Sequence, residues 1–163
     1  MKLTLKKILA LVAGGLAVIA FIMAFLSPLK SEMGSAVVNA EAADIWFEDG
    51  GTIIPFIAFI VALLAGAYLI VRQFISIPKD NTIFWVAIGL LVAAAVVIFL
   101  TETFYIGSQI AYLKDLGAPA AYLETAKTSM AEALGLGIGT LLGGILAALS
   151  AVCAVVSEKF IKD

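Results

Sequence analysis

The stretch Ile53–Val71 reads IIPFIAFIVALLAGAYLIV, which is 19 residues without a single charged side chain. At 1.5 Å per residue, a helix of this length reaches about 28 Å, close to the roughly 30 Å hydrocarbon core of a bilayer. A helix satisfies its own backbone hydrogen bonds, which lipid cannot do. The stretch therefore predicts a helix that crosses a membrane.

Three further stretches have the same character. Ile8–Leu26 and Ile83–Thr101 each contain 19 uncharged residues, and Ala133–Ser157 contains 25. Together the four stretches predict an all-α integral membrane protein, folded as a single domain, a four-transmembrane-helix bundle. The predicted helices cover residues 8–26, 53–71, 83–101 and 131–157, with outer loops at 27–52 and 102–130 and an inner loop at 72–82.

The composition supports a membrane protein as well. Apolar residues make up 63% of the 163 residues and charged residues 13%, whereas a soluble domain is about half apolar and a quarter charged. A soluble core of this size cannot hide such an excess, so the lipid bilayer is the expected partner. The net charge of -2, without a basic patch outside the membrane flanks, argues against binding of nucleic acid.

The distribution of basic residues predicts the orientation. The two ends and the inner loop carry seven Lys and Arg, and the outer loops carry three. By the positive-inside rule both termini are cytoplasmic, in a multi-pass protein of a bacterial-type cell membrane. Ile8–Leu26 is longer than the apolar core of a signal peptide, about 7–15 residues, so we interpret it as a retained anchor. The seven are Lys2, Lys6, Lys7, Arg72, Lys79, Lys159 and Lys162, and the three are Lys30, Lys114 and Lys127.

Several kinds of chemistry lack their residues. The chain contains no histidine, and Cys153 is its only cysteine, so histidine-ligated haem, Ser-His-Asp triads and a disulfide within the chain are excluded. Asp44 and Glu48-Asp49 could attract calcium, but their spacing does not match an EF-hand, and we interpret them as solvated loop charges. We expect a protein that is not an enzyme and that uses no cofactor and no metal site.

Small residues recur along the fourth stretch at four-residue spacing. Positions four apart share one face of a helix, and helices in lipid associate by close packing of such faces. The face predicts a contact with another helix of the same chain, for which Ala58, Ala62 and Gly66 of the second stretch and Ala13 and Ala17 of the first stretch offer a match. The alternative occupant is a second copy or the helix of a partner protein. The residues are Gly135, Gly139, Gly143, Ala147 and Ala151.

The loops carry weaker signals. Residues 35–38 favour a short strand, and Gly117 with Pro119 predicts that one helix stops and another begins. Residues 129–132 form a capping-box pattern, which predicts that the fourth helix opens there and that Glu132 serves as its cap. Similar patterns around Gly15 and Gly89 are consistent with two duplicated hairpins, or with chance similarity of apolar helices.

Two families share part of this plan. Four spans and a larger first outer loop that contains Trp46 resemble the claudin-like proteins, but the cysteine pair of that loop is absent here. Small multidrug transporters also have four spans but depend on a glutamate in the first span, and Ile8–Leu26 has none. The sequence identifies no family.

The functional hypotheses follow from these patterns. Reactive groups are missing while an association face is present, so the first hypothesis is an accessory or scaffold subunit that acts through helix–helix and outer-loop contacts. The alternative is a homo-oligomeric pore or small channel, because small-residue helices can pack around an axis and gate through apolar constrictions. A further alternative is a transporter of an apolar or lipid-like substrate, because no central carboxylate is present to bind an ion.

Overall fold

The computed structural model describes residues 4–33 and 36–161. Within these ranges the chain forms seven helices and three short strands. Four of the helices are long and apolar enough to cross a membrane, as the sequence predicts for a multi-pass protein. They are α1 (Leu5–Met23), α3 (Ile54–Val71), α4 (Asp80–Phe99) and α7 (Ile138–Lys159).

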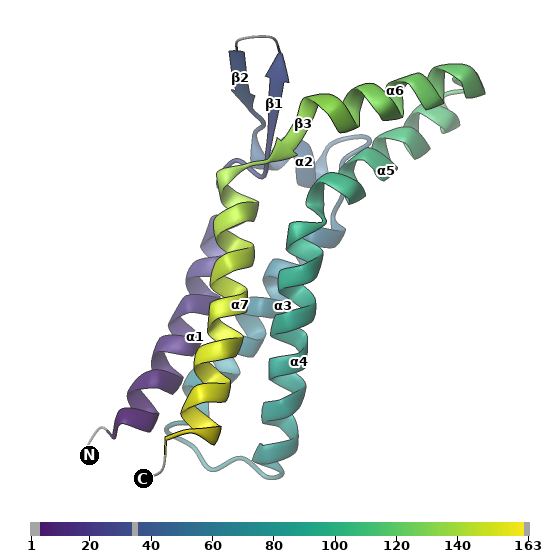
Figure 1. Ribbon diagram of the computed structural model, residues 1–163. Helices are drawn as coiled ribbons and strands as arrows, with labels where there is room; N and C mark the ends of the chain where they lie inside the picture. The colour runs from purple at the N-terminus through teal and green to yellow at the C-terminus, as the bar shows by residue number, and fades with distance from the viewer. Residues whose placement is uncertain (1–3, 34–35, 162–163) are drawn as a thin grey trace.

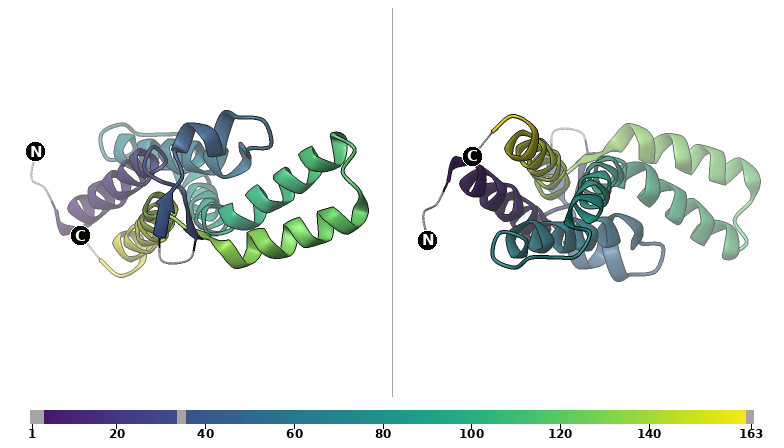
Figure 2. Two further views of the ribbon diagram at one scale, coloured as in Figure 1. Left: turned by 90° about the horizontal axis from the view of Figure 1, so that it is seen from above. Right: turned by 90° about the horizontal axis from the view of Figure 1, so that it is seen from below.

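These four helices form a bundle in which each packs against two neighbours. α1 lies against α3 and α7, and α4 lies against the same two helices on the other side. Figure 2 shows this ring from both ends. We call the end where α1 begins and α7 ends the base; the connection from α3 to α4 is also there (Figure 1). The opposite end is called the head.

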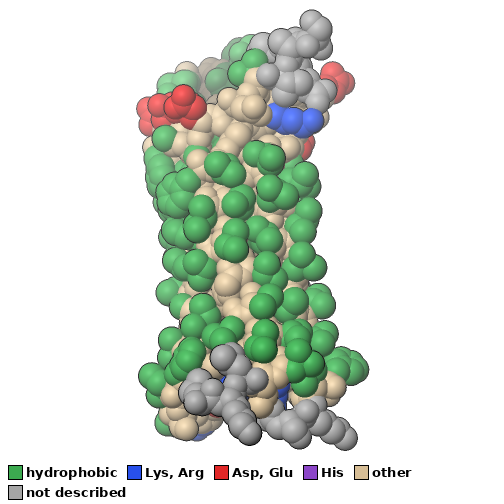
Figure 3. All heavy atoms as spheres, turned by 90° about the vertical axis from the view of Figure 1, so that its left-hand side faces the viewer, with side chains coloured by type: hydrophobic (Ala, Val, Ile, Leu, Met, Phe, Trp, Pro, Cys, Tyr) green, Lys and Arg blue, Asp and Glu red, His purple; other side chains and the backbone are tan. Residues whose placement is uncertain are grey.

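The bundle is closed by small side chains. The buried residues of α1 are alanines and one glycine, and a Cβ at Gly66 of α3 would lie only 2.5 Å from the Cβ of Ala17. Some large apolar side chains, such as Phe59 and Leu91, are buried among them, but many others point outward and cover the flank. In Figure 3 charged side chains show only near the two ends. Close contacts between small residues are typical of helices that pack in lipid.

The head contains the three strands and the three remaining helices. The strands form one antiparallel sheet in the order β2-β1-β3. Its members come from both loops, because β1 and β2 follow α1 whereas β3 precedes α7. The predicted strand is confirmed for residues 36–38, while residue 35 lies outside the described ranges. The elements are β1 (Leu29–Met33), β2 (Ala36–Asn39), α2 (Ala42–Phe47), α5 (Thr101–Asp115), α6 (Ala120–Ala133) and β3 (Leu134–Leu136).

The second loop of the head is a helical hairpin. α5 follows α4 after a break at Leu100, and α6 returns antiparallel to it (Figure 1). The predicted stop and restart is confirmed, because Gly117 has a positive φ of 83° and Pro119 immediately precedes α6. The hairpin projects sideways beyond the bundle in both views of Figure 2.

The predicted start of the fourth helix is wrong. α6 continues to Ala133, and three residues of β3 intervene before α7 begins at Ile138. Glu132 is therefore near the end of α6 and caps no helix start. The reason is long-range pairing: the edge of β1 takes up Leu134–Leu136, and the amide of Gly137 donates to the carbonyl of Pro28 at 3.0 Å. Local helix signals do not register such a distant partner.

Candidate functional site

The small-residue face of α7 lies inside the bundle. A Cβ at Gly139 would be 2.6 Å from the carbonyl oxygen of Met23 and 2.8 Å from that of Leu26. Both are backbone atoms of the segment where α1 ends, so the two helices touch there without an intervening side chain.

The same face continues toward the base. Gly143 faces the ring of Phe59 from α3, and a Cβ there would also lie 3.4 Å from the carbonyl oxygen of Ala20. Ala147 and Ala151 are buried further along. The chain's own helices thus occupy this face and leave no room for another helix, which corresponds to the internal-packing alternative.

Gly135 does not belong to this face. It lies in β3, paired with Lys30 of β1, and a Cβ on it would be 3.1 Å from Cε of that lysine. The structure therefore brings four of the five predicted residues together and places the fifth in the sheet.

Two side-chain hydroxyl groups of α7 donate hydrogen bonds to backbone carbonyls of α1 and of the segment that follows it. Ser150 donates to the carbonyl of Ala13 at 2.7 Å, and Thr140 donates to the carbonyl of Pro28 at 2.6 Å. Both side chains are fully buried. A buried hydroxyl needs such a partner, because an unpaired one is costly away from water.

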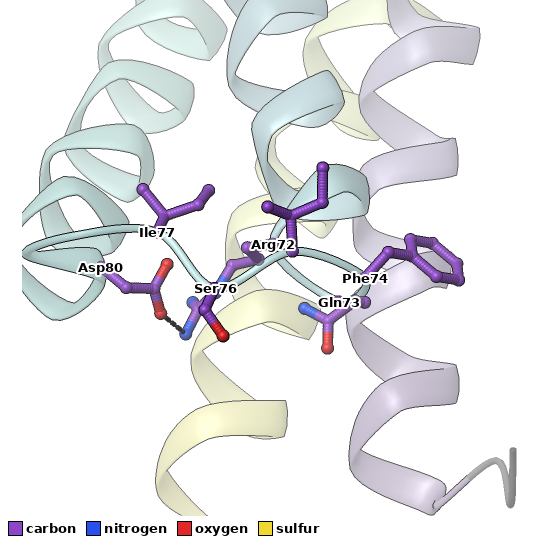
Figure 4. Close-up of a pocket in the computed structure, with 7 residues that line it drawn as sticks. Arg72, Gln73, Phe74, Ser76, Ile77 and Asp80 are labelled. Atoms are coloured by element: carbon purple, nitrogen blue, oxygen red, sulfur yellow. Dashed lines mark hydrogen bonds and ion pairs between the residues drawn. The ribbon is translucent and has the colours of Figure 1, made fainter.

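A charged cluster at the base was not foreseen from the sequence. Nη2 of Arg72 lies 2.7 Å from Oδ2 of Asp80 and 3.4 Å from Oε2 of Glu158. The guanidinium carbon is 4.3 Å from the centre of the Phe84 ring, within the range of a cation–π contact. Figure 4 shows Arg72 and Asp80 pointing toward each other across the loop that joins α3 to α4.

Two further side chains extend this cluster. The hydroxyl of Tyr68 donates to Oδ1 of Asp80 at 2.7 Å, and Nζ of Lys6 lies 4.0 Å from Oε2 of Glu158. The cluster therefore includes residues from α1, α3, α4 and α7 and joins the four helices at the base. The sequence signal that could have found it is the placement of Arg72 and Asp80 on either side of one short loop.

The charged groups of the hollow beside this cluster are already paired. The hollow measures about 410 Å³ and is lined by the α3–α4 loop from Arg72 to Asp80 (Figure 4). The two charged groups in its wall already pair with each other. We therefore interpret the cluster as one that stabilises the packing of the four helices rather than as a ligand site.

In the head, the loop between α1 and α3 contacts the loop between α4 and α7. Apart from the pairing of β1 with β3, the hydroxyl of Ser108 on α5 donates to the carbonyl of Gly51 at 2.5 Å. The buried indole of Trp46 on α2 donates to the carbonyl of Ala24 at 2.9 Å, which ties the head to the end of α1. The loops are thus parts of one folded unit.

Tyr105 of α5 lies near the contact between the two loops. Burial raises the pKa of its phenol, while the amide of Gln109, which donates to the phenol oxygen at 3.1 Å, acts in the opposite direction. The charges of Asp44 and Glu48 raise the pKa as well, which indicates that the acidic loop residues lie near enough to act on α5.

No known family or structure matches the chain. Comparisons with protein-family models, with curated proteins and with solved structures all find no match. Within residues 4–33 and 36–161, no three His, Cys, Asp or Glu side chains gather where a metal ion could be held.

The geometry separates two regions. The bundle buries its small residues against itself, and no described buried side-chain nitrogen or oxygen lacks a hydrogen-bond partner. The head, in contrast, presents an extended surface, because no residue of α6 is buried and α5 buries only Thr101 and Ile106. The candidate functional surface is therefore the head.

Proposed function

We propose that this chain is a non-enzymatic multi-pass protein of the cell membrane, an accessory or scaffold subunit that binds a membrane protein through its head. The observation that carries the proposal is the joining of both loops into one folded unit by the β1–β3 pairing. A loop that only connects two helices does not need a distant strand partner. A folded head with an exposed hairpin provides a surface of defined shape for a partner.

The charges supply the orientation for this proposal. Five basic residues of the described ranges lie at the base, namely Lys6, Lys7, Arg72, Lys79 and Lys159. The positive-inside rule puts that end in the cytoplasm, and the head then faces the outside. A partner would accordingly meet this chain at the outer membrane surface.

The pore and transporter alternatives have less support. A homo-oligomeric pore would use the small-residue face to pack copies around an axis, and that face is covered by α1 and Phe59. The outward flanks of the bundle carry large apolar side chains, which suit contact with lipid rather than with a water path.

The test is the composition of the native complex, extracted gently from its own membrane. We expect a second protein at fixed stoichiometry. A double variant at the hairpin tip, Leu116→Ser with Tyr122→Ala, removes side chains that are 66% and 56% exposed and should release the partner. Leu64→Ala, which removes a side chain that is 64% exposed on the flank of α3, is the matched control and should retain it.

The outcome can also go against the proposal. Recovery of the unmodified chain as a bare monomer would refute a stable partner. A homo-oligomer that conducts ions in liposomes would favour the pore instead, and retention of the partner by the tip variant would move the contact away from the hairpin.

A further inference from the structure

A groove lies between the two helices of the hairpin. Its volume is about 460 Å³, and it opens on both α5 and α6. The residues that decide its chemistry are Glu102, Ile106, Gly107 and Ile110 of α5, with Lys127 and Ala131 of α6. The groove is thus mostly apolar, with one carboxylate and one ammonium in its wall.

The groove begins at the level where a spanning helix ends. α4 reaches Phe99, and Glu102 follows in the first turn of α5. The hairpin extends sideways beyond the bundle (Figures 1 and 2). The foot of the groove therefore lies at the depth where the headgroups of one leaflet surround a four-span bundle.

The two charges are available to a ligand. Glu102 and Lys127 line the same groove from different helices, and the ion pairs among Lys6, Arg72, Asp80 and Glu158 at the base involve neither of them. One positive and one negative group beside an apolar floor are complementary to a molecule that carries both charges and a hydrocarbon chain.

We propose that this groove binds a zwitterionic phospholipid with an ammonium headgroup. The phosphate lies against Lys127, the ammonium donates hydrogen bonds to Glu102, and the apolar side chains of Ile106 and Ile110 line the groove beside the glycerol and its neighbouring methylene groups. Gly107 provides the space, since a Cβ built there has no heavy atom within 4 Å. The site does not depend on a protein partner, so it stands or falls separately from the function proposed above.

The test uses the full chain in detergent, with binding measured by native mass spectrometry. Phosphatidylethanolamine and phosphatidylglycerol with identical acyl chains serve as probes. We expect one phosphatidylethanolamine per chain, retained at least tenfold more strongly than phosphatidylglycerol. This competition needs no variant, so it remains decisive even if a substitution disturbs folding.

Variants locate the site. Lys127→Ala and Glu102→Gln should each weaken phosphatidylethanolamine binding about tenfold, which corresponds to about 1.4 kcal/mol for one charge-assisted contact. Gly107→Phe should abolish binding by filling the groove. Lys114→Ala removes a cation from the same hairpin outside the groove and should leave binding unchanged.

Two results would overturn the proposal. One is retention of phosphatidylglycerol equal to or stronger than that of phosphatidylethanolamine, which would show that only negative charge is recognised. The other is unchanged phosphatidylethanolamine binding by a folded Gly107→Phe chain, which would place the lipid elsewhere on the protein.

Discussion

Arg72 follows the last residue of α3 and Asp80 begins α4, and their ion pair of 2.7 Å closes the loop between these helices. Arg72 is the better buried partner, with only 11% of its side chain exposed against 33% for Asp80. Glu158 approaches the same guanidinium from α7. The α3–α4 loop, the shortest connection of the bundle, is therefore also the place where ion pairs link α3, α4 and α7.

Loss of this guanidinium should destabilise the whole bundle. Arg72→Ala leaves Asp80 without its cation, leaves Glu158 with Lys6 alone and removes the contact with Phe84, so we expect a loss of about 2–4 kcal/mol in the free energy of unfolding. Lys7→Ala removes the same charge from the base, where no described ion pair involves it, and should cost less than about 0.5 kcal/mol. Thermal unfolding in detergent, followed by tryptophan fluorescence, compares the two. Equal losses would show that net charge, not the pairing, matters.

Glycines of the bundle should respond in opposite directions to alanine. Gly139→Ala forces a methyl group onto backbone atoms of the α1 end and should destabilise the fold by about 1–3 kcal/mol. Gly15→Ala has open space around the new methyl and should stabilise α1 by about 0.5–1 kcal/mol, because glycine is the poorer helix former. The same unfolding assay measures both variants. Destabilisation by Gly15→Ala would mean that α1 has a contact absent from this structure.

The hydroxyl of Thr140 should contribute to the attachment of α7. Thr140→Val keeps the shape of the side chain but removes the donor to Pro28, and we expect a loss of about 0.5–1.5 kcal/mol. Thr125→Val, at an exposed position where the hydroxyl bonds its own helix at 3.0 Å, is the control and should stay within about 0.5 kcal/mol of the original. If the two variants behave alike, the bond to Pro28 adds nothing to stability.

The orientation can be read from single cysteines. In a chain with Cys153→Ala, we expect Leu116→Cys at the hairpin turn to react with a membrane-impermeant maleimide added to intact cells. Ser76→Cys in the α3–α4 loop should react only after the membrane is opened. The opposite pattern would invert the assignment of the base to the cytoplasm.

Alkaline pH should destabilise the folded head through the ionisation of Tyr105. The pKa of this phenol is raised by burial, so the neutral form is favoured in the folded chain. Its stabilising contribution is complete below the ordinary pKa of about 10 and declines as the pH rises toward the folded value. Absorbance at 295 nm, compared between the original chain and Tyr105→Phe, isolates this titration. A difference curve centred at or below the ordinary tyrosine value would contradict the raised pKa.

The spanning helices could be predicted because length and apolar character are local properties. Ile53–Val71 matches α3 within one residue. The sequence predicts the third span at Ile83–Thr101, yet α4 begins three residues earlier at Asp80, whose carboxylate pairs with Arg72. Charge content alone cannot show that two charges neutralise each other.

The misplaced start of the fourth helix has a different cause. Residues 129–132 do form a good helix signal, but α6 uses it in its last turn, and the strand that follows exists only because β1 is beside it. Four of the five small residues could be assigned to one face from their spacing alone. The small residues Ala13 and Ala17 mark the first stretch as one candidate to cover that face, and the second stretch is another. Which of them covers it depends on how α1 packs against α7, and that is a long-range property.

The pairing of Leu29 with Leu136 joins the beginning of the chain to its last quarter. During synthesis, β1 is made early, and the edge that pairs with β3 stays without a partner until the segment after α6 has been made. The sheet of the head therefore cannot be completed until the chain has been made as far as Leu136. A chain that stops short would display that open edge, and proteases or chaperones that recognise unpaired strands could distinguish it from the finished protein.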